Sequence, residues 1–232
     1  FNPDMIDNFK LYKGGIPSRY GGKISSILNV NTAEGNYQNP EYSGTIGLVS
    51  SKLKVSLPLI QDQTNVQLAG RYAYPSYIID FFPDNTTRDS EASFYDVNLR
   101  LNHQLSDASS LTLSSYISED EFQFSPDTSY QWKNRGVSLT WNKSLNGMKT
   151  LSARGIYSTY ENGILGQSPA IEYDYRSDVS QVGFQSIMTI ANASDHLFEF
   201  GVESNFYELN TGKIRPISDT SSVNPSKNPI DQ

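Results

Sequence analysis

Apolar and polar residues alternate along most of this chain. The clearest example is the segment 95–105, where alternate positions are apolar apart from His103. The positions between them are polar: Asp96, Asn98, Arg100, Asn102 and Gln104. Successive side chains of a β-strand point to opposite faces. The pattern therefore predicts a strand with one apolar face and one wet face.

The same alternation predicts a series of further strands. It recurs in residues 66–74, 111–118, 137–142, 181–190 and 198–206, and more weakly in 151–160. A change of phase between Ile46 and Leu53 predicts two more strands within 44–57, which meet at a turn near Ser50 and Ser51. No comparably long segment shows a helical stripe. We expect an all-β, antiparallel fold of about nine strands.

The predicted connections alternate in length. Short polar turns are expected at 61–65, 106–109, 146–149 and 192–195, and long connections at 75–92, 119–131 and 162–177. This alternation is typical of a transmembrane β-barrel, with tight periplasmic turns and extended outer loops. The strand that begins near residue 65 would then run outward. Aromatic residues towards the outer strand ends would form a girdle: Tyr72, Tyr74, Tyr116, Trp132, Tyr157, Phe206 and Tyr207.

The first part of the chain has a different sequence pattern. Two short apolar strands, 9–13 and 24–30, flank a connector that contains Gly14, Gly15, Pro17, Gly21 and Gly22. Glycine supplies backbone angles that other residues adopt only at a cost, so the segment should pack tightly and turn sharply. A polar stretch, 31–43, follows. We expect a domain boundary there, with 1–35 ending a compact insert and 36–232 forming a wall around it.

Residues 13–30, KGGIPSRYGGKISSILNV, resemble the closing motif of the plug domain in TonB-dependent outer-membrane receptors, in particular those of the Bacteroidetes type. Residues 44–59 and the strand with Ala69, Gly70 and Arg71 are similar to the opening barrel strands of that family. The commoner family form has Arg-Gly-Pro where this chain has Lys13-Gly14-Gly15. The plug-to-barrel ion pair of that arginine is carried to Lys13 as an expectation. The motif residues have a structural role: Lys13, Gly14, Gly15, Pro17, Arg19, Tyr20, Gly21 and Gly22.

The resemblance implies a fragment of a larger receptor. Residues 1–35 would be the C-terminal part of the plug and 36–232 an incomplete N-terminal part of the barrel, because plugged outer-membrane transporters have about 22 strands. The implied function is energy-coupled uptake of a scarce nutrient such as a siderophore or metal chelate. The implied partners are outer-membrane lipid, the nutrient, and the TonB complex through a segment absent from this chain.

Two other functions remain open at this point. One is a SusC-like importer of glycans or peptides that works with a surface lipoprotein lid. The other is a soluble or surface-exposed β-sandwich used in adhesion, in which the apolar faces would pack against a second sheet. We expect no enzyme activity, because no nucleophile, Walker or dinucleotide motif is present.

Two sets of residues are candidates for solute contact. Tyr77, Phe81 and Phe82 lie in an apolar outer loop, 75–84, and would expose hydrophobic surface unless a partner or ligand covers it. Five charged residues are expected to face the barrel lumen, where they would pair with one another, with the plug or with a solute: Arg71, Asp96, Arg100, Glu199 and Glu203.

Composition narrows the remaining function classes. The formal net charge is -7, which gives no support to nucleic-acid binding. The absence of cysteine excludes disulfides and thiolate metal sites in this chain. His103 and His196 are far apart in sequence, and the acidic run 119–121 lacks the spacing of a calcium loop. We therefore expect neither a metal nor a cofactor.

Overall fold

The computed structural model describes residues 2–22, 25–79, 90–125, 127–168, 171–191, 196–217 and 221–223. Two short helical segments occur, η1 (Pro3–Met5) and α1 (Ser76–Ile79). The strands are β1 (Ile6–Tyr12), β2 (Ile27–Thr32), β3 (Glu41–Ile46), β4 (Ser50–Ile60), β5 (Thr64–Ala73), β6 (Glu91–Ser106), β7 (Ser109–Ser125), β8 (Thr128–Asn146), β9 (Lys149–Ser168), β10 (Ile171–Ala191) and β11 (Leu197–Pro216). Neither helical segment is long and apolar enough to cross a membrane.

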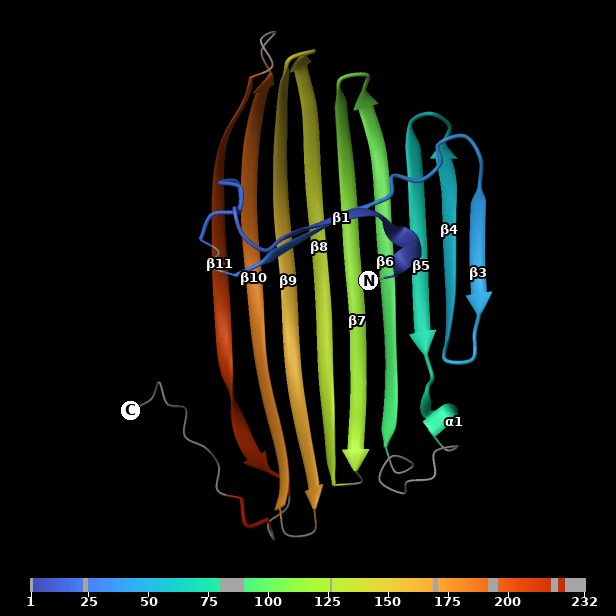
Figure 1. Ribbon diagram of the computed structural model, residues 1–232, viewed down its shortest axis with the longest axis vertical. Helices are drawn as coiled ribbons and strands as arrows, with labels where there is room; N and C mark the ends of the chain where they lie inside the picture. Colours follow the sequence, from blue (N-terminus) through green and yellow to red (C-terminus); the bar gives the residue numbers. More distant parts are fainter. Residues whose placement is uncertain are drawn as a thin grey trace.

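Nine strands form one antiparallel sheet in which each strand pairs with the next along the chain, in the order β3 to β11 (Figure 1). The all-β prediction and the expected strand number are confirmed. Hairpin connections between neighbouring strands produce this order, because antiparallel strands can be joined by very short turns.

The remaining strands, β1 and β2, form a separate antiparallel hairpin. Figure 1 shows this hairpin lying across the sheet, from the region of β5 and β6 to β11. We call the sheet face that it crosses the inner face and the opposite one the outer face. Side chains that bind the N-terminal segment, among them Lys52, Gln67 and Arg100, mark the inner face.

The strand pairing assigns the remaining side chains to one face or the other. Val97 lies opposite Ile117, and Val137 lies opposite Tyr157, which in turn lies opposite Val182. These apolar side chains share the outer face, and each is at least 38% exposed. In the described part of the chain, the only other sheet is the hairpin on the inner face. The second sheet that a β-sandwich needs against the outer face is therefore missing there.

Tight turns close the strands at one end of the sheet, which we call the turn end. Residues 61–63, 107–108 and 147–148 connect successive strands there, as predicted, and the predicted turn at 192–195 lies outside the described residues. The turn expected near Ser50 and Ser51 lies at 47–49 instead, and both serines begin β4.

The long connections predicted at the opposite end, which we call the far end, are partly wrong. Residues 119–131 and 162–177 are almost entirely strand, and the pair Glu119 and Lys133 lies within the β7–β8 ladder. Only 126–127 separate β7 from β8. The sequence misled here because charged residues replace the apolar set in these segments. The connection between β5 and β6 is long, as expected, and begins with α1.

Candidate functional site

The connector of the hairpin, 13–26, is described except for 23 and 24. Gly15 and Gly22 have φ values of 60° and 70°, a region that glycine adopts without strain. Among the described residues, no atom lies within 4 Å of where a Cβ would stand at Gly14, Gly15, Gly21 or Gly22. The prediction of tight packing is therefore wrong for these positions. Their role is the turn geometry at Gly15 and Gly22.

An ion pair joins this connector to the wall. Arg19 pairs with Glu199 on β11, with a second contact of 3.3 Å between its Nε and Glu199 Oε2. The connector and the wall enclose a recess of about 630 Å³, which Gln185, Glu203 and Asn205 also line. Among the described residues, Lys13 makes no ion pair. The cation that binds the wall is thus Arg19, six positions further along the motif.

The stretch after β2 is held on the inner face by side chains of β5 and β6. Arg100 Nη1 donates to Thr32 O at 2.9 Å, and Gln67 Nε2 donates to Ala33 O at 2.8 Å. The Nδ2 groups of Asn65 and Asn102 both donate to Glu34 O at 2.9 Å. These wall side chains hydrogen-bond backbone carbonyls at the end of β2 and in the stretch that follows it, so those carbonyls do not depend on water.

Gly35 makes this close approach possible. Its φ is 79°, and a Cβ there would lie 2.7 Å from the amide carbon of Gln67. Residues with a Cβ fit neither the backbone angle nor the space. The Gln67 Oε1 atom is buried and has no hydrogen-bond partner in the described structure.

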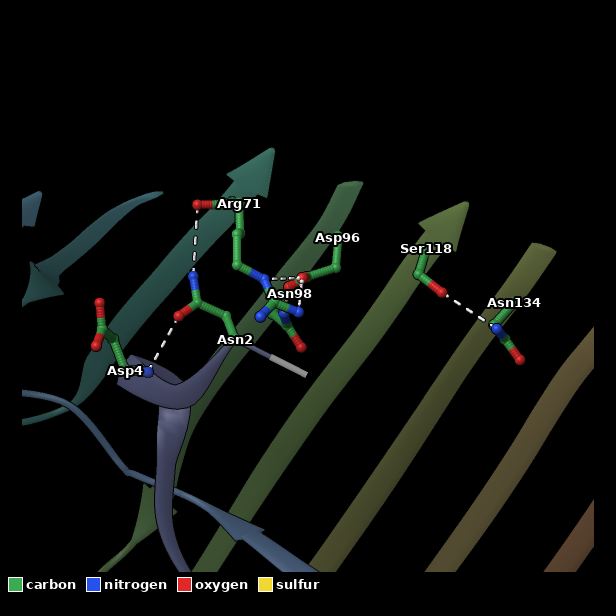
Figure 2. A network of polar contacts seen from close by, with 8 residues as sticks. Asn2, Asp4, Arg71, Asp96, Asn98, Ser118 and Asn134 are labelled. Atoms are coloured by element: carbon green, nitrogen blue, oxygen red, sulfur yellow. Dashed lines mark hydrogen bonds and ion pairs between the residues drawn. The ribbon is translucent and has the colours of Figure 1, made fainter. Parts of the chain in front are cut away.

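The beginning of the chain is also bound to the inner face. Lys52 Nζ lies 2.7 Å from Asp4 Oδ1, and Lys54 Nζ donates to Asp4 O at 2.8 Å. Asn2 donates to the backbone oxygen of Gly70 at 3.4 Å (Figure 2). Strands β4 to β6 therefore anchor one side of the hairpin, and β11 anchors the other through Arg19.

A charged pair lies on the inner face beside this anchor. Arg71 Nη2 lies 2.6 Å from Asp96 Oδ2, and the Asp96 side chain is only 2% exposed (Figure 2). Asn98 donates to the other Asp96 oxygen at 3.1 Å, and the Arg71 guanidinium stands 4.7 Å from the centre of the Phe94 ring. Each polar atom of the buried carboxylate thus has a partner.

The structure places the five charged residues expected in the lumen on the inner face. Arg71 and Asp96 pair with each other, Arg100 binds the N-terminal segment, and Glu199 binds Arg19. Glu203 accepts hydrogen bonds from Gln185 at 3.0 Å and from Asn205 at 2.6 Å. Of the predicted ligand-contact residues, Phe81 and Phe82 lie outside the described residues. The backbone of Tyr77 lies in α1.

The predicted aromatic girdle is wrong at three positions. Tyr116, Trp132 and Tyr207 lie opposite Gly136, Asn162 and Gln181, and this register places all three on the inner face. Tyr72, Tyr157 and Phe206 are on the outer face. The period of two along each strand decides the face. Position along a strand alone therefore does not place an aromatic residue in the girdle.

Two titratable groups lie near the turn end of the sheet. Burial raises the pKa of the Tyr37 phenol, and the nearby carboxylate of Glu34 raises it further. His103 Nδ1 lies 2.7 Å from Thr64 Oγ1 on the outer face. Within the described ranges, no group of three or more metal-ligating side chains could hold a metal ion.

Replacing Arg19 by alanine should loosen the connector without unfolding the sheet. The pair is partly exposed, at 40% for the Arg19 side chain and 29% for that of Glu199, so its loss should cost less than about 1 kcal/mol of unfolding free energy. We expect hydrogen exchange to accelerate in residues 13–22 and β1, and to stay unchanged in β7 and β8. Equal protection of the connector in the R19A and parent proteins would contradict this role of the ion pair.

The fold has a counterpart among solved structures. The chain "Copper transporter OprC" superposes with a TM-score of 0.71 at 13% sequence identity, covering 92% of this chain and 34% of that one. This chain thus spans about a third of the length of that structure. No protein-family model and no curated protein matches the sequence. The comparison establishes a shared fold: this chain superposes on about a third of that transporter chain.

Proposed function

We propose that this chain is part of a TonB-dependent outer-membrane transporter, with the N-terminal hairpin belonging to the plug and the sheet to the barrel wall. One observation carries the proposal: the sheet exposes its apolar face and binds the polar N-terminal segment on the other. Water-soluble proteins rarely expose so large a continuous apolar surface. A barrel in lipid requires it, with its polar side turned to the lumen.

The extent of the apolar surface supports a membrane-spanning role. Outward-facing side chains run from Leu139 on β8 to Phe184 on β10 and Phe200 on β11, and they are 47%, 51% and 60% exposed. The hydrophobic band ends at the row of Val137, Tyr157, Val182 and Phe206. Beyond that row the outer face carries Arg135, Lys133 and Glu161 instead. In this proposal, that change marks the outer boundary of the membrane.

Transport would consist of binding and gating, with no covalent step. Contacts to β4–β6 and the Arg19–Glu199 pair hold the hairpin on the inner face. A solute could pass along the wall only when part of the plug moves. Force from the energised TonB complex would act through a segment N-terminal to these residues. The Arg19–Glu199 pair is more exposed than the part-buried contacts on the opposite side and would break at lower cost.

The receptor would belong to the Bacteroidetes type, as the resemblance of residues 13–30 suggests. For the solute we retain two classes. One is a siderophore or another metal chelate. The other is a glycan or peptide that enters with help from a surface lipoprotein lid, as in SusC-like importers. A specific observation at the far end of the sheet favours a neutral glycan, as argued below.

The test uses the complete protein in its own cells. The protein should fractionate with the outer membrane and migrate faster on gels before heating than after it. Cells should lose uptake of labelled solute when the TonB complex is deleted or the proton-motive force is dissipated. Ferric siderophore and labelled neutral oligosaccharides serve as the two probes. Recovery of the protein in the soluble fraction, or uptake that persists without TonB, would refute the proposal.

A further inference from the structure

Above the apolar band, the outer face of strands β7 to β11 becomes charged and their inner face becomes aromatic. On the outer face, Lys133 pairs with Glu119 at 3.1 Å, and Arg135 pairs with Glu161 at 3.7 Å. This part of the sheet therefore stands in water on its outer side. We call the residues beyond the Val137–Tyr157–Val182–Phe206 row the far extension.

The inner face of the far extension is aromatic. One continuous set of inward-facing side chains, which we call the inner aromatic surface, spans β7 to β10: Phe122, Tyr130, Trp132, Tyr160, Ile164 and Tyr175. The Tyr160 side chain is 41% exposed and that of Phe122 is 37% exposed. Below the boundary row, the same face of β7 and β8 is made of small hydroxyl and amide residues such as Ser114, Ser138 and Thr140.

A slipped register does not explain the exchange. The β8–β9 and β9–β10 ladders run without a shift through the boundary row, and the shift in the β7–β8 ladder lies beyond Gln123. A one-residue slip would be needed to turn an outer set of side chains inward. The sequence therefore places aromatic rings on the inner wall of the entrance while the outer wall becomes charged.

The geometry of Trp132 and Tyr130 suggests a ring platform. Their ring planes differ by only 9°, with centroids 6.1 Å apart. The register places Asp120 and Asn162 on either side of Trp132. A flat apolar surface with a carboxylate and an amide beside it offers both ring stacking and directional hydrogen bonds.

The charges on this surface favour one class of solute. Among the described inward-facing residues of the far extension in β7 to β10, Asp120 carries the only charge. The basic residues Lys133, Arg135 and Arg176 are all on the outer face. An anionic metal chelate would find no cation on this part of β7 to β10, and Asp120 would repel it; the inner-face cation Arg71, on β5, is already paired with Asp96.

We propose that the inner aromatic surface binds a neutral carbohydrate, with the rings of Trp132 and Tyr130 against sugar faces and with Asp120 and Asn162 beside the sugar hydroxyls. A sugar ring presents C–H groups on its faces and hydroxyls at its edge, which matches this combination of groups. The inference rests on the proposed function, because the inner face is an entrance only if the sheet is a barrel wall.

The test measures binding to the complete purified protein in detergent by calorimetry. The probes are neutral hexasaccharides of glucose, mannose and xylose in α and β linkages, and the anionic iron(III) tris-catecholate complex. We expect at least one hexasaccharide to bind and the iron complex not to bind. W132A should weaken hexasaccharide binding at least about tenfold, and W132F should retain most of the affinity because it keeps a ring face.

The matched control is W141A, which removes the other tryptophan of this chain from the outer face of the same strand. It should leave the affinity unchanged, and heat-modified migration on gels shows whether each variant is folded. Absence of hexasaccharide binding, equal loss in W132A and W141A, or binding of only the iron complex would overturn the inference. A protein that is in the outer membrane and shows TonB-dependent uptake but binds no hexasaccharide would overturn this inference alone. Recovery in the soluble fraction would instead overturn the proposed function.

Discussion

Replacing Asp96 by alanine is expected to lower the unfolding free energy by about 3 kcal/mol, because removal of one member of a buried ion pair leaves its partner without a counter-charge. Asp96 is 1% exposed and accepts hydrogen bonds from both Arg71 and Asn98. In the D96A variant, the Arg71 guanidinium would keep only the Phe94 ring beside it. Guanidinium titration of the protein in lipid vesicles measures the change.

The control for this prediction is the double variant R71M/D96L. Removing both charges leaves neither of them unpaired, so the double variant should be more stable than D96A. S118A, which removes the hydroxyl 3.2 Å from Asn134 Nδ2, is a neutral comparison and should cost only about 1 kcal/mol. If D96A and S118A cost the same, the charged pair does not stabilise the wall as we argue.

Replacing Leu139 by arginine on the outer face is expected to cost about 1–3 kcal/mol, because Leu139 lies one outward-facing position inside the boundary row and the cost of a lipid-facing basic residue falls from about 2–4 kcal/mol at the middle of a bilayer to about 0–1 kcal/mol at its edge. Leu139 is 47% exposed in the structure. On a soluble sheet, an arginine at such an exposed position would change stability little. This variant therefore discriminates between lipid and water as the neighbour of the outer face.

Q131R is the matched control for depth. Gln131 lies on the same face of the same strand, beyond the end of the apolar band, and its Nε2 donates to Glu119 at 2.7 Å. An arginine there would stand in water next to a carboxylate, so we expect a change within about 1 kcal/mol. Vesicle refolding measures both variants. Equal stability of L139R and Q131R would place the outer face in water and contradict the membrane assignment.

The strands within the apolar band could be predicted from the sequence because their environment repeats every second residue. In β6, Val97, Leu99 and Leu101 alternate with Asp96, Asn98 and Arg100, and the structure places the two sets on opposite faces. Lipid on one side and a polar interior on the other impose this pattern on each strand that spans the band. The fold class and the short turns follow from it.

The far extension could not be predicted in the same way. Where β7 and β8 leave the band, Glu119 and Lys133 replace the apolar outer set, and aromatic residues appear on the inner face. Without the apolar phase as a reference, the alternation resembled a polar loop. Only the strand pairing shows that Trp132 and its neighbours face inward. A residue beyond the band can be assigned to a face only if the strand register continues without a shift from the residue back into the band.

The contacts of the hairpin also required the tertiary structure. Residues 13–30 suggested a plug turn, yet the ion pair expected at Lys13 is made by Arg19, with Glu199 on a strand 180 positions away in sequence. Similarly, Arg100 binds the backbone of Thr32. Local sequence carries no information on which wall residue meets which loop residue. Those distances depend on how the hairpin lies across the sheet.

Three features of this protein can be predicted from the sequence alone: its antiparallel strands, the apolar side of each strand within the band, and the positions of the tight turns, because each depends on neighbours only a few residues apart. The tertiary structure decided how far the strands extend, which charges pair, and that the far extension turns its aromatic residues inward. These depend on the alignment of segments distant in the chain, where packing and register are set by the whole sheet.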